Sequence, residues 1–163
     1  MKKIVLVVGA RPNFMKIAPV LRALKAFPGA FEPLLVHTGQ HYDSNMSEVF
    51  FEELSLPRPD VHLNAGSGSH AVLTARIMER FETVLLDFQP DLVMVPGDVD
   101  STLACALAAV KEGVPVAHLE AGLRSFDWTM PEEINRVVTD HVSSILFVTE
   151  ESGRDNLERE GVP

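Results

Sequence analysis

Short apolar runs recur along the chain and alternate with longer segments of helical periodicity. The first run, Ile4 to Val8, holds no polar residue, which is typical of a strand covered on both faces in a parallel sheet. Similar runs predict further strands at Phe31 to His37, Val61 to Leu63, Leu92 to Val95, Val114 to Leu119 and Ile145 to Val148.

The segments between these runs carry apolar side chains at helical spacing. Pro12 falls in a first helical turn, and Gly113 and Gly161 fall where helices should end. The segment Thr129-Met-Pro-Glu132 has the form of a capping box. Helices are therefore predicted from Pro12 to Phe27, Ser47 to Leu54, Ser69 to Asp87, Thr102 to Lys111, Thr129 to His141 and Glu151 to Glu160.

This alternation of strands and helices predicts an α/β fold. Parallel strands need right-handed crossovers, and the crossover helices cover the faces of the sheet. We therefore expect a doubly wound parallel sheet, Rossmann-like, in one domain that comprises residues 1–163.

Composition argues against several kinds of partner. The net charge is −9 and no basic run is longer than a pair, which argues against nucleic acid or an anionic membrane. The single cysteine, Cys105, cannot form an internal disulfide and is predicted to be a small core residue. The apolar start is too short for a signal peptide and no run could span a bilayer, so we expect a cytoplasmic protein.

Several predicted strands are followed directly by polar residues. In doubly wound sheets, ligands bind outside the carboxyl ends of the strands. The residues expected to line that edge are Arg11, His37 to His41, Asp98, Glu120 and Thr149 to Glu150.

Three carboxylates are candidates for proton transfer at this edge. Glu120 follows a predicted strand and has no capping role. Asp98 is left over, because Asp100 or Ser101 can cap the next helix. Glu132 belongs to the capping box, so capping and chemistry both stay open for it. Carboxylates placed close together push their pKa values apart, which lets one act as a base and another as an acid.

Other polar residues suggest contacts to an anionic ligand. Gly9-Ala-Arg-Pro12 is a strand-to-helix turn whose amides attract anions, with Arg11 inside it and Lys16 one turn further on. The alternative is that both cations are solvated surface charges. His41, after Gln40, is either a ligand contact or a structural hydrogen-bonding group.

Motifs for a cofactor or a metal ion are missing from the sequence. It contains no Gly-x-Gly-x-x-Gly fingerprint, no P-loop lysine pattern and no Cys/His cluster with metal spacing. We therefore expect neither a cofactor nor a metal ion.

Six segments, in order along the chain, resemble motifs of the non-hydrolysing UDP-N-acetylglucosamine 2-epimerases. They are Gly9-Ala-Arg-Pro-Asn-Phe-Met-Lys-Ile-Ala-Pro19, Thr38-Gly-Gln-His41, Pro96-Gly-Asp-Val-Asp-Ser-Thr102, Val116-Ala-His-Leu-Glu-Ala-Gly-Leu-Arg124, Pro131-Glu-Glu-Ile-Asn-Arg136 and Thr149-Glu-Glu-Ser152. The resemblance runs from end to end of the chain.

This resemblance implies one half of a two-domain protein in the glycosyltransferase-B arrangement, with the active site between the domains. Residues 1–163 would be the N-terminal domain. The C-terminal nucleotide-binding domain would lie outside this chain, which is expected to be inactive alone. The implied reaction interconverts UDP-N-acetylglucosamine and UDP-N-acetylmannosamine. UDP is eliminated to give 2-acetamidoglucal, and is then added back with a proton on the other face.

The resemblance also assigns roles to residues by motif. It implies an acid/base set of Asp98, Glu120 and Glu132. It implies contacts to the UDP-sugar from Arg11, Lys16, Gln40, His41 and Arg136. Cell-surface polysaccharide biosynthesis is the setting that it suggests, and apolar surface left by a missing domain could drive assembly into a homodimer.

Two other functions stay open on the sequence alone. A glycosyltransferase-B enzyme that transfers a sugar to an acceptor shares the expected architecture. A non-catalytic module that binds sugar nucleotides would use the same edge without proton transfer.

Overall fold

The computed structural model describes residues 1–39 and 58–162, apart from the side chain of Arg11. The predicted helix at 47–54 and the candidates Gln40 and His41 lie outside the described residues. The described elements are β1 (Lys2–Val8), α1 (Arg11–Lys25), β2 (Phe31–His37), β3 (Val61–His62), α3 (His70–Phe88), β4 (Leu92–Pro96), α4 (Asp100–Lys111), β5 (Val116–Ala121), α5 (Pro131–Val142), β6 (Ile145–Val148) and α6 (Glu151–Arg159).

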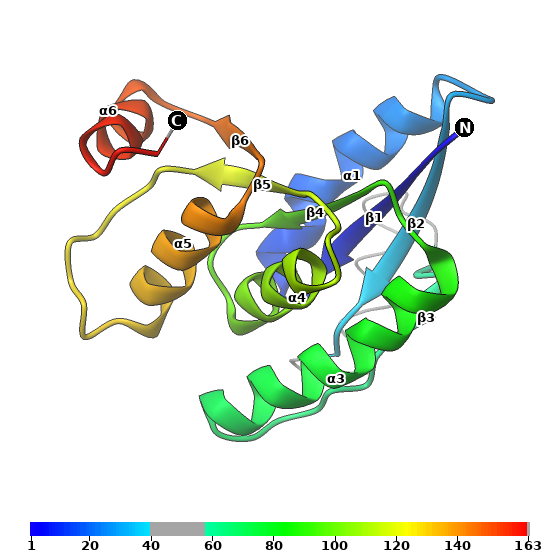
Figure 1. Cartoon of the computed structure of the whole chain (residues 1–163), viewed down its shortest axis with the longest axis horizontal. Helices are drawn as coiled ribbons and strands as arrows, with labels where there is room; N and C mark the ends of the chain where they lie inside the picture. The colour runs from blue at the N-terminus through cyan, green and yellow to red at the C-terminus, as the bar shows by residue number, and fades with distance from the viewer. Residues whose placement is uncertain (40–57, 163) are drawn as a thin grey trace.

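The described strands form one six-stranded parallel sheet in the order β3-β2-β1-β4-β5-β6. The chain moves outward from β1 to one edge and then returns to β4 on the other side of β1. In Figure 1, α1 lies behind the sheet, whereas α3, α4 and α5 lie in front of it. The predicted doubly wound, Rossmann-like sheet is confirmed, and its order reverses between β1 and β4, where such folds open a crevice for ligands.

Strand β1 is buried on both faces. Val5 and Val7 pack into the apolar cluster beneath α3 and α4. Leu6 and Val8 pack on the opposite side, against α1. Burying each such side chain contributes roughly 1.5–3 kcal/mol, which explains why the buried part of this strand, Ile4 to Val8, contains no polar position.

Helix α4 packs closely at the centre of its layer because it presents small side chains. Cys105 is fully buried there, and burial raises the pKa of its thiol. The prediction of a small core residue is confirmed. The buried small residues of the helix are Ala104, Cys105, Ala106, Ala108 and Ala109.

Two predicted helix caps are wrong. Helix α4 follows Val99 without a side-chain cap, and the buried Asp100 accepts hydrogen bonds from His70 (2.8 Å) and Asn135 (3.2 Å). Helix α5 follows Met130, and the Thr129 hydroxyl donates to Asp127 instead (2.6 Å). In both cases the side chain expected to cap finds another hydrogen-bond partner, which the local pattern does not reveal.

The start of α6 touches the end of β5 through backbone atoms. Gly122 has φ +82, and a Cβ added there would overlap the carbonyl oxygen of Gly153 in α6. Glycine is therefore required at position 122 for both conformation and space.

We expect Gly122→Ala to lower the free energy of unfolding by about 2–4 kcal/mol, since left-handed strain adds to overpacking. Gly113→Ala is the matched control, because Gly113 has φ +73 but no atom within 4 Å of an added Cβ. It should cost about 1–2 kcal/mol from strain alone. Urea denaturation measures both, and equal losses would show that the contact with α6 is not close-packed.

Candidate active site

The carboxyl ends of β4 and β5 bring two of the predicted carboxylates together. Pro96 at the end of β4 is in register with Leu119 of β5, and the Gly97 amide donates to the Leu119 carbonyl (3.0 Å). A Cβ placed on Gly97, the residue before Asp98, would lie 3.8 Å from a carboxylate oxygen of Glu120. Asp98 and Glu120 therefore share one edge of the sheet.

Glu120 lies inside β5 rather than beyond its end, so the predicted strand boundary is wrong there. The pairing register with β6 shifts between Leu119 and Ala121, and Glu120 has φ +71. Such a bulge turns a side chain away from the regular alternation. The Glu120 carboxylate accepts a hydrogen bond from the ammonium group of Lys16, and both side chains are 30% exposed.

Asp98 is paired with Arg136, which reaches it from α5. The same guanidinium donates to Glu133 (2.8 Å), which is buried. Burial opposes the charge on Glu133, but hydrogen bonds from the Ser125 and Phe126 amides and from Arg136 outweigh it, so the pKa of Glu133 is lowered. Asp98 itself stays 34% exposed and accessible to a ligand.

Within residues 1–39 and 58–162, Glu132 differs from its neighbour Glu133 in forming no hydrogen bond or ion pair through its side chain, and it is partly exposed. It lies four residues before Arg136 on α5, so the two side chains share a helix face. The capping explanation does not apply to Glu132, because the helix starts one residue later than the capping box requires. The sequence analysis missed the structural role of Glu133. Two adjacent glutamates do not indicate which of them faces the protein interior, because that depends on how the helix is rotated about its axis.

The turn into α1 supplies fewer free amides than expected. The Ala10 amide donates to the Asn13 side chain (2.9 Å), and the Asn13 amide donates to the Ala10 carbonyl (3.0 Å). The Asn13 side chain also donates to Pro96 (2.8 Å), which fixes α1 to the end of β4. Arg11 begins the helix, but its side chain is outside the described part of the structure. Lys16, also in α1, contacts the Glu120 carboxylate.

The end of β2 carries a neutral histidine. His37 stacks on Phe14 (5.5 Å between ring centroids) and meets the edge of His62 (5.3 Å). Burial, with a smaller effect from His62, lowers the pKa of His37 to about 4. His118 is fully buried in β5.

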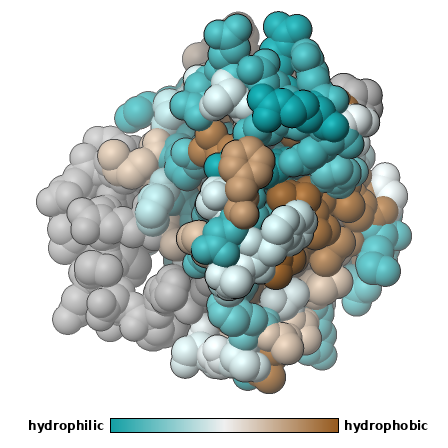
Figure 2. Space-filling view, turned by 90° about the vertical axis from the view of Figure 1, so that its left-hand side faces the viewer, coloured by the Kyte–Doolittle hydropathy of each residue, from teal (hydrophilic) through white to brown (hydrophobic). Residues whose placement is uncertain are grey.

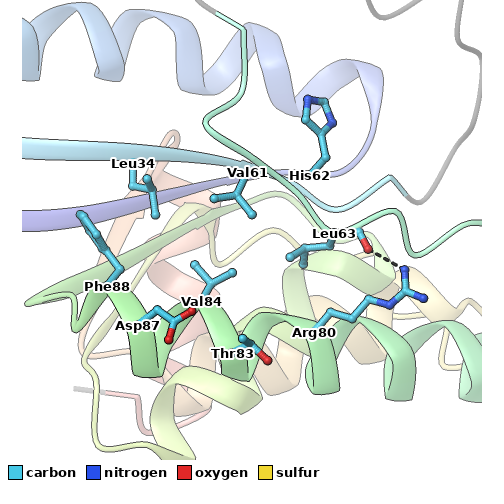
Figure 3. Close-up of a pocket in the computed structure, with 9 residues that line it drawn as sticks. All are labelled: Leu34, Val61, His62, Leu63, Arg80, Thr83, Val84, Asp87 and Phe88. Carbon is cyan, nitrogen blue, oxygen red and sulfur yellow. Dashed lines mark hydrogen bonds between the residues drawn. The ribbon is translucent and has the colours of Figure 1, made fainter.

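A groove of about 620 Å³ lies away from Asp98 and Glu120, between α3 and the β2–β3 edge of the sheet. Figure 3 shows Leu34, Val61, Val84 and Phe88 around it, with Arg80 donating to the Leu63 carbonyl (2.6 Å) at one side. A second groove, of about 510 Å³, lies between α3 and α5. Neither groove is lined by the site carboxylates, which lie on an open edge.

Within residues 1–39 and 58–162, no three His, Cys, Asp or Glu side chains are grouped in a way that could hold a metal ion. No helix in this described part of the chain combines the length and hydrophobicity needed to cross a bilayer.

Comparison with known proteins identifies the family. The profile of the family described as UDP-N-acetylglucosamine 2-epimerase matches residues 22–163. The chain belongs to this family. A UDP-N-acetylglucosamine 2-epimerase homolog from Methanococcus maripaludis is 52% identical over 160 residues, which cover 98% of this chain and 44% of the relative. A UDP-2,3-diacetamido-2,3-dideoxy-D-glucuronate 2-epimerase from Pseudomonas aeruginosa is 51% identical over 159 residues, covering 98% and 45%.

Solved structures agree with this assignment. The Methanocaldococcus jannaschii UDP-GlcNAc 2-epimerase, crystallised in complex with UDP-GlcNAc and UDP, superposes with a TM-score of 0.95 at 49% identity. The match covers 99% of this chain and 44% of that protein. The chain thus spans less than half the length of these epimerases and corresponds to their N-terminal half. The resemblance inferred from the motifs is confirmed.

We expect Glu133→Gln to lower the free energy of unfolding by about 2–3 kcal/mol, since it weakens charge-assisted hydrogen bonds to two amides and Arg136 in a buried place. Glu132→Gln, one residue away and without a described partner, should change it by less than about 0.5 kcal/mol. Urea denaturation of both variants is the measurement. Equal losses of unfolding free energy would mean that Glu133 does not contribute more to stability than Glu132.

Proposed function

We propose that this chain provides the acid/base side of the active site in a 2-epimerase of UDP-2-acetamido sugars. The supporting observation is the juxtaposition of Asp98 and Glu120 at adjacent strand ends, each ion-paired with a cation and each about one-third exposed. Epimerisation needs both proton transfer and stabilisation of a departing diphosphate, and this edge offers carboxylates and cations together.

The chemistry explains why these groups are needed. The hydrogen at C2 of the sugar is not acidic, because no carbonyl stands next to it. A base removes that proton while the C1–O bond to UDP breaks, which leaves a C1=C2 double bond in 2-acetamidoglucal. UDP then adds back to C1 and an acid protonates C2 on the other face. Asp98, Glu120 and Glu132 are the proposed acid/base groups, and their individual roles are not assigned.

Cations would stabilise the diphosphate during these steps. Lys16 and Arg136 lie beside the carboxylates, and Arg11 begins the neighbouring helix. A diphosphate at the edge would compete with Glu120 and Asp98 for these cations. Gln40 and His41, the other proposed substrate contacts, follow the end of β2.

The names of the relatives support the class of substrate. One is crystallised with UDP-GlcNAc and UDP, and another is named for a UDP-2,3-diacetamido sugar. Both sugars carry an acetamido group at C2, where the proposed reaction takes place. We propose UDP-N-acetylglucosamine, with UDP-N-acetylmannosamine as product, as the first pair to test.

The same proposal includes three further points: a second domain that completes the site, a homodimer and a cytoplasmic location. The open position of the carboxylates supports a second domain that closes over them. Figure 2, seen from the side of α5 and α6, shows a hydrophobic area beside hydrophilic side chains, and Ile134 of α5 is 42% exposed. Exposed apolar area of this kind supports self-association.

The function is tested by the chain alone and by the chain joined to the C-terminal half of the M. jannaschii epimerase. Each is incubated with UDP-N-acetylglucosamine in D2O, and the products are identified by NMR. We expect the chimera to form the 2-epimer with deuterium at C2, and the chain alone to form none. Without such product from this sugar or from the diacetamido sugar, the proposal is wrong.

Substitutions in the chimera test the acid/base set. Glu120→Gln, Asp98→Asn and Glu132→Gln should each lower kcat by roughly 10²–10⁴-fold. Glu79→Gln, at an exposed position of α3, is the control and should leave kcat unchanged. Turnover that survives Glu120→Gln would favour the non-catalytic alternative, and sugar transfer to an added acceptor would favour a glycosyltransferase.

A further inference from the structure

A buried His–Asp pair lies behind the proposed site. His118 of β5 and Asp140 of α5 are both fully buried. One ring nitrogen of His118, Nδ1, lies 2.6 Å from Oδ1 of Asp140. The other, Nε2, lies 2.6 Å from the carbonyl oxygen of Gly97. A carbonyl oxygen only accepts, so Nε2 donates to Gly97.

Asp140 accepts hydrogen bonds on its other oxygen as well. Oδ2 accepts from the Gly122 amide (3.0 Å) and from Arg124 (2.7 Å). Burial raises the pKa of Asp140, but the hydrogen bonds and charges of His118 and Arg124, with the Gly122 amide, outweigh it and the pKa is lowered. Asp140 is thus the common acceptor for His118, Arg124 and the Gly122 amide.

The first consequence concerns the backbone that carries Asp98. Gly97, with φ +69, is held on both sides, since its amide donates to Leu119 and its carbonyl accepts from His118. That carbonyl belongs to the peptide bond between Gly97 and Asp98. The hydrogen bond from the His118 ring therefore fixes the orientation of the peptide plane that precedes Asp98.

The second consequence concerns the exit of β5. Glu120 has φ +71, a left-handed conformation that residues with side chains rarely adopt. Such a conformation persists when its surroundings hold it. Asp140 binds the amide of Gly122, two residues later, and so anchors the strand just beyond Glu120.

We propose that His118 and Asp140 are positioning residues that set the spacing between the Asp98 and Glu120 carboxylates. This inference rests on the proposed function, which assigns those carboxylates the proton transfers. Neither residue touches substrate, because both are sealed inside the domain. Buried ion pairs stabilise proteins little compared with apolar side chains of similar size, so stability alone does not account for charged groups here.

The geometry is tested on the 163-residue chain by NMR. His118→Leu and Asp140→Leu should shift or broaden the backbone amide resonances of Asp98 and Gly122. Asp140→Asn should largely restore them, since an asparagine can accept from Gly122 and donate to a neutral His118. His118→Gln, which retains a donor, gives a second readout if the leucine variants do not fold. His141→Gln, at an exposed position next to Asp140, is the control.

The consequence for turnover is tested in the chimera. His118→Leu and Asp140→Leu should lower kcat roughly 10–100-fold with KM changed less than about threefold, because misplacement of the carboxylates affects the reacting geometry. Asp140→Asn should keep kcat within about threefold of the parent, because the hydrogen bonds persist. If the pair only stabilised the fold, the substitutions would lower the free energy of unfolding without lowering kcat more than they change KM.

Separate outcomes overturn the two proposals. Unmoved Asp98 and Gly122 resonances in the substituted chains, or moved resonances with unchanged kcat, would overturn the positioning role. A chimera that is inactive without any substitution would contradict the proposed function instead. The resonances of the chain alone would then still decide whether the pair positions the two carboxylates.

Discussion

Two ion pairs allow like charges to stand side by side at the edge of the sheet. Asp98 and Glu120 lie at the ends of adjacent strands, and carboxylates that lie near each other repel unless cations accompany them. Lys16 reaches Glu120 from α1, and Arg136 reaches Asp98 from α5. These helices lie on opposite faces of the sheet (Figure 1), so the charge balance of the edge depends on both layers. A sheet covered by helices on both faces suits this charge balance, because a helix on each face contributes one cation to the same edge of the sheet.

Four carboxylates at and behind this edge divide into two sets by depth. In the ion pairs at the edge, the Glu120 and Asp98 side chains are about one-third exposed to water, where electrostatic interactions are weak. Glu133 and Asp140 are buried and hold backbone amides with their oxygens. The exposed set is free to exchange partners with a ligand, whereas the buried set fixes the backbone. Closure of the edge by a ligand or by protein would exclude water and strengthen the interactions of the exposed set.

Much of the fold and part of the site follow from local pattern. Strand β1 was predictable because an unbroken apolar run is required where both faces are covered, and the shared edge of Asp98 and Glu120 follows from parallel topology. Helix caps were mispredicted because Asp100 and Thr129 bind other side chains. The division between Glu132 and Glu133 depends on a rotation of about 100° along the helix, which a motif with two adjacent glutamates does not specify. The bulge at Glu120 and the contacts of His118 depend on pairing between distant segments, which no local pattern specifies.

The direct contact between Gly122 and Gly153 has a mechanical consequence. Two backbones that touch have no side chains between them, so rotamer changes cannot absorb relative movement. A displacement of α6 must therefore be passed on to the exit of β5. Anything that pulls or pushes on the last helix of this chain acts, through a rigid joint, on the strand that bears Glu120.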